Sequence, residues 1–286
     1  MQVGILYSRI RKDEKLLLSE LRDRGHEVTK IDVRDQAFEL DDAPEAFEGV
    51  DVVLDRCLAT SRSLYATRFC EAYGIPVVNA PDTAETCADK AKTSLALAGA
   101  GVPTPETKVA FTEEAALEAI ESFGYPCVLK PVVGSWGRLV AKIDSRSAAE
   151  AILEHKATLG HYEHKVFYVQ EFVEKPGRDV RVVAVDGDPV AAMVRSSDHW
   201  LTNAAKGAET DAFELDDEAK DLVQRASDAV GGGLLGVDLM ETGDSYTVHE
   251  VNHTVEFKAL DDAVDVDVPA AVVDWLETKV PQEVPA

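Results

Sequence analysis

The stretch that most constrains the fold is residues 125–141, YPCVLKPVVGSWGRLVA, in which two apolar segments flank a glycine-containing loop. The apolar run before Lys130 predicts a buried strand, with the ammonium group where the strand leaves the core. The loop itself is formed by Gly134, Ser135, Trp136, Gly137 and Arg138. Backbone N–H groups of such a turn can bind an anion, and the sequence contains no Walker motif. These features predict a phosphate-binding hairpin; the alternative is an ordinary glycine hairpin with a surface lysine.

The charge of the chain excludes some classes of partner. In 286 residues there are 53 Asp and Glu against 29 Lys and Arg, a net charge of −24. Binding to nucleic acid or to an anionic membrane without sequence preference needs a basic surface, so neither is expected as a partner. The acids are dispersed along the chain, which favours a halophilic surface that stays soluble at high salt, where repulsion is screened. The alternative is a protein that is merely acidic.

The cysteines indicate a reducing compartment. None of the four, Cys57, Cys70, Cys87 and Cys127, forms a C-x-x-C pair or a zinc-spaced cluster with histidine. The first residues do not resemble a signal peptide, and no apolar run approaches the roughly 18 residues of a membrane span. We therefore expect a soluble cytoplasmic protein with free thiols.

The order of apolar segments predicts an α/β fold with three parts. Residues 1–85 alternate strands (2–7, 27–33, 50–54, 74–79) with helices (12–25, 61–73), which is typical of a small parallel α/β domain. Residues 86–165 form the second part, which begins within a helical entry over 81–100, contains a break at 101–105 and carries the glycine loop. Residues 166–286 form a third lobe, with strands at 167–172, 180–185, 190–195, 234–240 and 246–251 and helices at 216–230 and 269–279.

The third lobe carries a candidate metal site. Asp238 lies in the strand GVDL, and Glu250 and Asn252 flank Val251, so a period of two places them on one face of the next strand. Two carboxylates and an amide oxygen on neighbouring strands are hard-oxygen ligands that suit Mg²⁺. The alternative is that these are solvent-exposed strand ends.

A linker after the strand at 167–172 is a candidate nucleotide site. The run Gln170, Glu171, Phe172 and Val173 offers backbone groups and apolar walls to a flat purine. Asp179 could accept a ribose hydroxyl and Arg181 could face phosphates. Taken alone, the segment could equally be a charged hairpin.

The motifs occur together in an order that resembles a known family. The segments Asp89-Lys90, VLKP, GSWGR, QEFVEKPGRDVRV, GVDL and HEVNHTVEF are similar to those of the ATP-grasp superfamily, and within it to the RimK-like carboxylate–amine ligases. The likeness to the LysX/ArgX branch of these ligases extends along nearly the whole chain. It implies an ATP-grasp fold, an N-terminal domain followed by two lobes that enclose ATP.

The resemblance also implies roles for individual residues. Lys90 and Lys130 would contact ATP phosphates beneath the loop 134–138, residues 170–173 would hold adenine, and Asp179 the ribose. The metal set Asp238, Glu250 and Asn252 would hold Mg²⁺, with two ions implied. Facing the acyl phosphate and the amino-acid substrate would be Arg181, Arg195, Asn203, His253, Thr254, Glu256 and Phe257. One departure is Lys206-Gly207-Ala208, where relatives have Arg-Gly-Gly; a lysine can still bind phosphate as a point charge.

The implied activity is an ATP-dependent ligation that forms an amide through an acyl phosphate. Its acceptor would be the terminal Glu of a small acidic amino-group carrier protein of the LysW type, and its donor α-aminoadipate or glutamate, in lysine or arginine biosynthesis. The alternatives are a glutamate ligase acting on a ribosomal protein or peptide, a nucleotide-binding regulatory module without turnover, and a kinase-like phosphoryl transferase. A homo-oligomer is expected. Cations that could attract an acidic carrier are Arg9, Arg11, Lys175 and Arg178.

Overall fold

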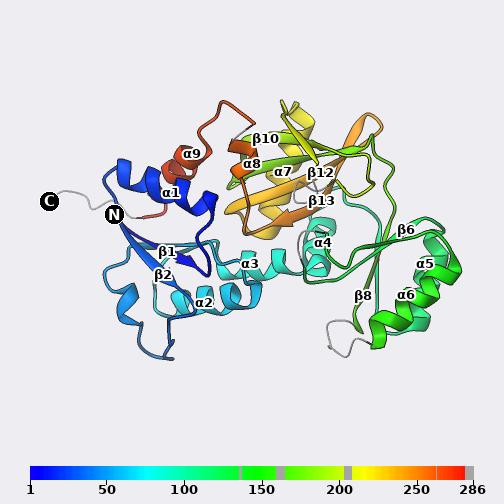
Figure 1. Ribbon diagram of the computed structural model, residues 1–286, viewed down its shortest axis with the longest axis horizontal. Helices are drawn as coiled ribbons and strands as arrows, with labels where there is room; N and C mark the ends of the chain where they lie inside the picture. Colours follow the sequence, from blue (N-terminus) through cyan, green and yellow to red (C-terminus); the bar gives the residue numbers. More distant parts are fainter. Residues whose placement is uncertain (135–136, 159–164, 203–207, 262, 281–286) are drawn as a thin grey trace.

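The structure is a computed structural model that describes residues 1–134, 137–158, 165–202, 208–261 and 263–280. It contains three sheets, one in each third of the chain. Figure 1 shows the N-terminal sheet and the central lobe with α5 and α6 at opposite ends of the molecule, and the strands β10, β12 and β13 between them. No helix in the described ranges is long and apolar enough to cross a membrane.

The N-terminal sheet is parallel and buried on both faces. Its strands are β1 (Gln2–Tyr7), β2 (Glu27–Asp32), β3 (Val52–Asp55) and β4 (Val77–Val78), in the order β2-β1-β3-β4. Helix α1 (Lys12–Asp23) packs against one face and α2 (Thr60–Ala72) against the other. Because both faces are covered, four consecutive residues of β1, at positions 3–6, are buried. The strands and helices predicted for residues 1–85 are therefore confirmed, with ends shifted by a few residues; a short 3₁₀ helix, η1 (Glu45–Phe47), was not predicted.

The helical entry predicted over residues 81–100 is two helices, α3 (Pro81–Ala88) and α4 (Lys90–Gly99). Asp89 separates them with an extended backbone, and its carboxylate accepts hydrogen bonds from the amides of Ala91 (2.8 Å) and Lys92 (3.1 Å). This side chain is an N-cap, which satisfies amides that the first turn leaves without partners. The cap makes Lys90 the first residue of α4.

The central sheet has the order β5-β8-β6-β7 and is antiparallel. Its elements are β5 (Thr107–Ala110), α5 (Glu113–Phe123), β6 (Cys127–Lys130), β7 (Ala141–Ile143), α6 (Arg146–Thr158) and β8 (Phe167–Glu171). The predicted hairpin is confirmed, because β6 and β7 pair with Cys127 opposite Ile143. The lobe boundary drawn after residue 165 is displaced, because β8 pairs with β5 and β6 and so completes this sheet.

The third sheet is antiparallel, with the order β11-β10-β9-β12-β13. Its elements are β9 (Arg178–Val185), β10 (Asp188–Ser196), β11 (Glu209–Ala212), α7 (Asp217–Val230), β12 (Leu234–Thr242) and β13 (Ser245–Asn252). One face packs on α7 and α4. The short polar strand β11 was not predicted.

The other face of this sheet is divided between packing and the cavity. At one end Val183, Met193 and Leu234 pack in the same core as Phe257, α1 and the last helix, α9 (Val268–Glu277). At the other end the same face carries charged side chains. Figure 1 shows α9 beside α1, so the chain returns to the N-terminal domain after the short helix α8 (Lys258–Asp261). The last third of the chain is therefore packed against the first.

Candidate active site

A cavity of about 650 Å³ lies between the central and third sheets. Residues from β6, the glycine loop, β8, β9, β10, β12 and β13 line it, and Leu58 and Thr60 of the N-terminal domain close one side. Strand alternation explains the lining, because Cys127 and Leu129 of β6 face the helices while Val128 and Lys130 face the cavity. The cavity therefore brings together segments from all three parts of the chain.

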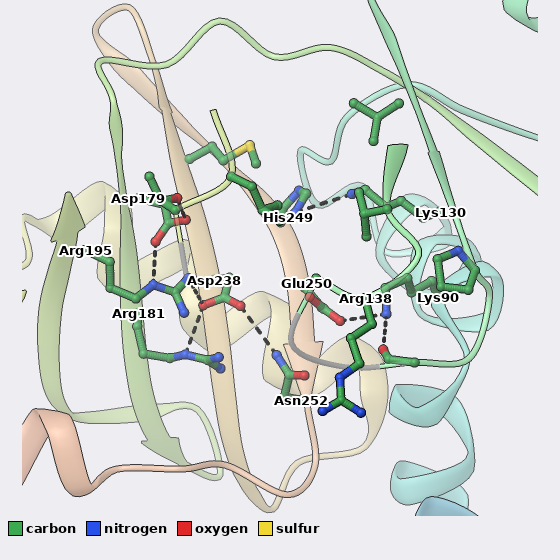
Figure 2. A pocket seen from close by; sticks show the side chains of 18 of the residues that line it. Lys90, Lys130, Arg138, Asp179, Arg181, Arg195, Asp238, His249, Glu250 and Asn252 are labelled. Carbon is green, nitrogen blue, oxygen red and sulfur yellow. Dashed lines mark hydrogen bonds and ion pairs between the residues drawn. The ribbon is translucent and has the colours of Figure 1, made fainter. Parts of the chain in front are cut away.

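The three predicted metal ligands lie together in this cavity. Asp238 pairs directly with Glu250 across β12 and β13, and Asn252 is the next residue of β13 on that face. The amide nitrogen of Asn252 lies 3.5 Å from Oδ2 of Asp238 (Figure 2). The sequence predicted that these oxygens share a face, and the register confirms it.

Two arginines form ion pairs with the buried carboxylate of Asp238. Oδ1 of Asp238 lies 3.0 Å from Nε of Arg181 and 2.9 Å from Nη2 of Arg195. Nε of Arg195 also lies 2.6 Å from Oδ1 of Asp179 (Figure 2). The second oxygen of Asp179 accepts a hydrogen bond from the hydroxyl of Thr202 and lies 3.2 Å from Nζ of Lys175. Asp179 thus takes part in an ion-pair network, and its contact with a ribose stays a prediction.

The two predicted phosphate lysines approach the same region from the other side. Nζ of Lys90 lies 2.9 Å from Oε1 of Glu250 and donates to the carbonyl of Gly134 at 2.7 Å. Nζ of Lys130 donates a hydrogen bond to Oε1 of Gln170. It also lies 3.3 Å from Nε2 of His249 (Figure 2). Gln170 is buried, so its side chain positions Lys130, a role that the sequence did not suggest.

His249 is a cavity residue that strand alternation did not predict. A β-bulge shifts the register of β12 and β13: Asp238 pairs with Glu250, but Leu239 pairs with Val248. The extra residue in β13 lets His249 and Glu250 both line the cavity, while Val248 and Val251 both pack in the core. No residue type in this segment signals such a bulge.

Burial and charge shift several pKa values in the cavity. Burial, assisted by Lys90 and Lys175, lowers the pKa of Lys130 to about 7. Burial and the neighbouring lysines lower the pKa of His249 well below its ordinary value, which favours the neutral ring. Burial raises the pKa of Asp238 despite its two arginines. Burial would also raise the pKa of Glu250, but Lys90, Lys130 and Arg181 together outweigh burial and the net shift is downward.

These carboxylates fit a divalent cation. Burial raises the pKa of Asp238 even beside two arginines, so the arginines do not fully offset the cost of burying its charge. In the described residues no group of three or more His, Cys, Asp or Glu side chains is placed so that these alone could hold a metal ion. The donor set is two carboxylates and one amide, a set of hard oxygens that Mg²⁺ accepts together with water and phosphate oxygens.

The predicted adenine linker lies at the cavity wall. Glu171, Phe172 and Val173 all line it. Nζ of Lys142 lies 4.6 Å from the ring centre of Phe172, and the ring of Trp200 lies 6.1 Å from that of Phe172. Two aromatic rings, tilted by 53° to each other, are therefore present where the sequence predicted a purine site.

The described part of the glycine loop also lines the cavity. Gly134, Gly137 and Arg138 contribute to its wall. Gly137 has φ of +62°, and a Cβ there would lie 2.6 Å from Cδ2 of Leu201, so this position requires glycine. The predicted residues Ser135, Trp136, Asn203, Lys206 and Gly207 lie outside the described residues.

The predicted substrate residues after Asn252 divide into two groups. His253, Thr254 and Glu256 line the cavity. Phe257 does not: it is fully buried in the core, with the guanidinium of Arg56 5.7 Å from its ring centre. Direct contact between Phe257 and a substrate is therefore a wrong prediction, because the chain turns this side chain inward.

The cations predicted to attract a carrier have different surroundings. Lys175 is buried in the cavity network, so it is not a surface cation. Arg178 is 42% exposed, but its guanidinium forms two hydrogen bonds with Glu241, at 2.6 and 2.7 Å. Arg11 is paired with Glu14 and Glu256. These pairs reduce the charge that each of the three offers to a partner.

Comparisons with known proteins agree with this arrangement. Residues 3–86 match the LysX preATP-grasp domain family and residues 87–276 the RimK-like ATP-grasp domain family. The chain is 34% identical to an α-aminoadipate–LysW ligase LysX from Sulfurisphaera tokodaii, over 90% of this chain and 92% of that protein. It is 31% identical to a glutamate–LysW ligase ArgX from Sulfolobus acidocaldarius, over 97% of this chain and 98% of that protein. The crystal structure of a RimK domain ATP-grasp protein from Sphaerobacter thermophilus superposes with a TM-score of 0.81 at 33% identity, covering 96% of this chain and 99% of that one.

Proposed function

The chain belongs to the RimK-like ATP-grasp ligases, and we propose that it joins the amino group of α-aminoadipate or glutamate to the terminal Glu side chain of a LysW-type carrier protein. The relatives named for this reaction span nearly the whole chain. The observation that carries the proposal is the pairing of Asp238 with Glu250 in a cavity that is also lined by four lysines and three arginines.

The cavity is suited to charge neutralisation and alignment. Phosphoryl transfer to a carboxylate depends mainly on positioning and on compensation of the developing negative charge. Cys87 is the cysteine in the lining, and burial raises its pKa to about 12, so it is a thiol and not a nucleophilic thiolate. The side chains that line the cavity therefore favour direct ligation over a covalent enzyme intermediate.

The nucleotide would occupy the part of the cavity that lies next to the central sheet. In this arrangement Lys90 and Lys130 bind phosphate oxygens, and the linker at residues 171–173 holds the adenine. Lys130 is held by Gln170 and His249, so its ammonium is oriented before the nucleotide binds. Asp238, Glu250 and Asn252 would hold Mg²⁺, for which we propose two ions; bound there, magnesium supplies positive charge that stabilises the phosphate oxygens.

The carboxylate that accepts the phosphoryl group would meet the arginines of the third sheet. The γ-phosphoryl group passes from ATP to a carboxylate oxygen, ADP leaves, the amine attacks the acyl carbon, and inorganic phosphate leaves as the amide forms. Nη1 of Arg181 is buried and has no hydrogen-bond partner among the described residues. A donor in this state is costly unless a ligand satisfies it. We assign Arg181 and Arg195 to the acyl phosphate.

The two amino acids differ by one methylene, which is worth only about 1–3 kcal/mol of discrimination in a pocket. We favour α-aminoadipate and expect glutamate to be used as well. The test is mass spectrometry of a LysW-type carrier after incubation with the enzyme, ATP, Mg²⁺ and each amino acid in turn. The added mass identifies the amino acid. If neither amino acid modifies the carrier while a ribosomal protein or peptide gains glutamate, the alternative activity is correct.

A further inference from the structure

The segment from His253 to Lys258 is held in place by the N-terminal domain. The carboxylate of Asp13, which is fully buried, accepts hydrogen bonds from the amides of Phe257 (2.7 Å) and Lys258 (2.9 Å). The carbonyl of His253 accepts a hydrogen bond from the side chain of Asn79 at 2.7 Å. Both ends of the segment are thus fixed by residues that are far away in sequence.

The negative charge in this segment is already paired. Glu256 forms an ion pair with Arg11, which also lies 2.7 Å from the buried carboxylate of Glu14. Glu14 in turn accepts a hydrogen bond from the buried Arg56 at 3.2 Å. An unpaired Glu256 at the cavity wall would repel an acidic substrate. The ion pair with Arg11 reduces this repulsion.

The same packing determines which side chain reaches the cavity. Phe257 is buried beneath Arg56, whereas the next residue, Lys258, is exposed and lines the cavity. Thr254 and Ala259 lie in the same wall, and Leu58 and Thr60 come from the N-terminal domain. Lys258 is thus a cation on the side of the cavity that is lined by the first and last parts of the chain.

Among the described residues, Lys258 differs from four other cations of the cavity in having no side-chain partner. Lys90 is paired with Glu250, Lys175 with Asp179, and Arg181 and Arg195 with Asp238. Within the described part of the chain, the ammonium of Lys258 forms no hydrogen bond or ion pair. In a protein with a net charge of −24, an unpaired lysine at a cavity wall is available to an anionic ligand.

We propose that the ammonium of Lys258 binds a carboxylate of the substrates, on the side of the cavity lined by Thr60 and Thr254. The inference rests on the proposed function, because that reaction joins two acidic partners. The carboxylate belongs either to the side chain of the free amino acid or to the acidic end of the carrier. Lys258 touches substrate but transfers no group, so its effect should appear in KM and in substrate discrimination.

The experiment compares Lys258→Gln and Lys258→Arg with wild type, with Lys220→Gln as a matched control. Lys220 is an exposed lysine of α7 that does not line the cavity. Steady-state rates of carrier modification are measured while glutamate, α-aminoadipate, the carrier and ATP are varied in turn. Glutamine serves as an uncharged analogue of glutamate. Loss of a hydrogen bond to a charged group predicts a KM rise of roughly 10- to 100-fold in Lys258→Gln, with only a small change in Lys258→Arg.

The affected substrate identifies the source of the carboxylate. A higher KM for glutamate and α-aminoadipate, with weaker discrimination against glutamine, assigns the amino-acid side chain. A higher KM for the carrier alone, with the KM for amino acids unchanged, assigns the carrier. The KM for ATP should stay within about twofold in either case.

Two results would overturn the inference, and they are distinguishable. If wild type modifies the carrier and Lys258→Gln has the KM values of Lys220→Gln, the inference fails while the proposed function stands. If wild type modifies the carrier with neither amino acid, the proposed function fails and the inference with it.

Discussion

Replacement of Gly236 by alanine should damage the active site more than the fold. Gly236 lies in β12, one residue before Val237, and its Cα faces the cavity side of the sheet. A Cβ at this position would lie 2.5 Å from Nη1 of Arg181 and 2.8 Å from Cγ2 of Val255. Both distances are shorter than van der Waals contact, so the guanidinium must move away from its 3.0 Å contact with Asp238.

The magnitudes of the two effects can be separated. Overpacking of a core position lowers the free energy of unfolding by about 1–3 kcal/mol. Alanine also reduces the conformational entropy of the unfolded chain, which raises the free energy of unfolding by about 0.4–1 kcal/mol. The free energy of unfolding should therefore fall by roughly 0–2.6 kcal/mol, which most domains tolerate. Loss of one positioned donor to developing charge typically lowers kcat by about 10²–10³-fold, and we expect a loss of that size for Gly236→Ala.

The assay is urea unfolding together with steady-state ligation, with Gly99→Ala as control. Gly99 is the last residue of α4, and a Cβ there would meet no atom within 4 Å. The control should keep full activity and gain up to about 1 kcal/mol of stability. A folded Gly236→Ala protein with wild-type kcat would refute the assignment of Arg181 to the reacting groups.

The other predictions concern the metal ligands, salt and pH. Glu250→Gln keeps the shape of the side chain but removes a charge from the proposed Mg²⁺ site, so turnover should fall by orders of magnitude; near wild-type rates at saturating Mg²⁺ would contradict the ligand assignment. The Tm should rise between about 0.1 and 2 M KCl, because the Debye length shrinks to roughly 3 Å at 1 M and screens the net charge of −24; a flat or falling Tm would argue against halophilic adaptation. Burial raises the pKa of Asp55 from 3.8 to about 6, so the folded state binds the carboxyl proton more tightly than the unfolded state does. The protonated carboxyl therefore contributes stability that is complete below about pH 3.8 and is lost as the pH rises through about 6. Asp55→Asn should therefore gain stability relative to wild type between about pH 4 and pH 6, by up to roughly 3 kcal/mol; chemical unfolding at a series of pH values measures this, and a constant difference would exclude the shift.

Local patterns were enough to predict most secondary structure and part of the site. The alternation of apolar strands and helices defined the parallel N-terminal sheet, and the spacing of Glu250 and Asn252 placed both on one face of β13. Glycine requirements were also predictable in part, because residue 137 needs a positive φ. These features depend on interactions between residues close in sequence, so the sequence alone contains the signal.

Tertiary structure decided which residues meet across the cavity. The ion pair between Lys90 and Glu250 joins residues 160 positions apart (250 minus 90), and no local pattern encodes such a distance. His249 enters the site through a bulge whose position depends on the pairing of two strands. The strand β8 was assigned to the wrong lobe because its apolar run fits either sheet and only hydrogen-bonded partners distinguish them.

The segment after Asn252 illustrates the same division. The family resemblance predicted a substrate-facing turn over residues 253–257, but not which side chains face the cavity. Asp13, Arg11 and Arg56, all from the N-terminal domain, pair Glu256, bury Phe257 and leave Lys258 exposed at the cavity wall. Periodicity and spacing predicted the elements, because these are local properties of a chain, and the order of the motifs predicted the type of chemistry through the family that they resemble. Long-range packing decided the partner of each charge, because a buried ion is stabilised only by the groups that the fold brings beside it.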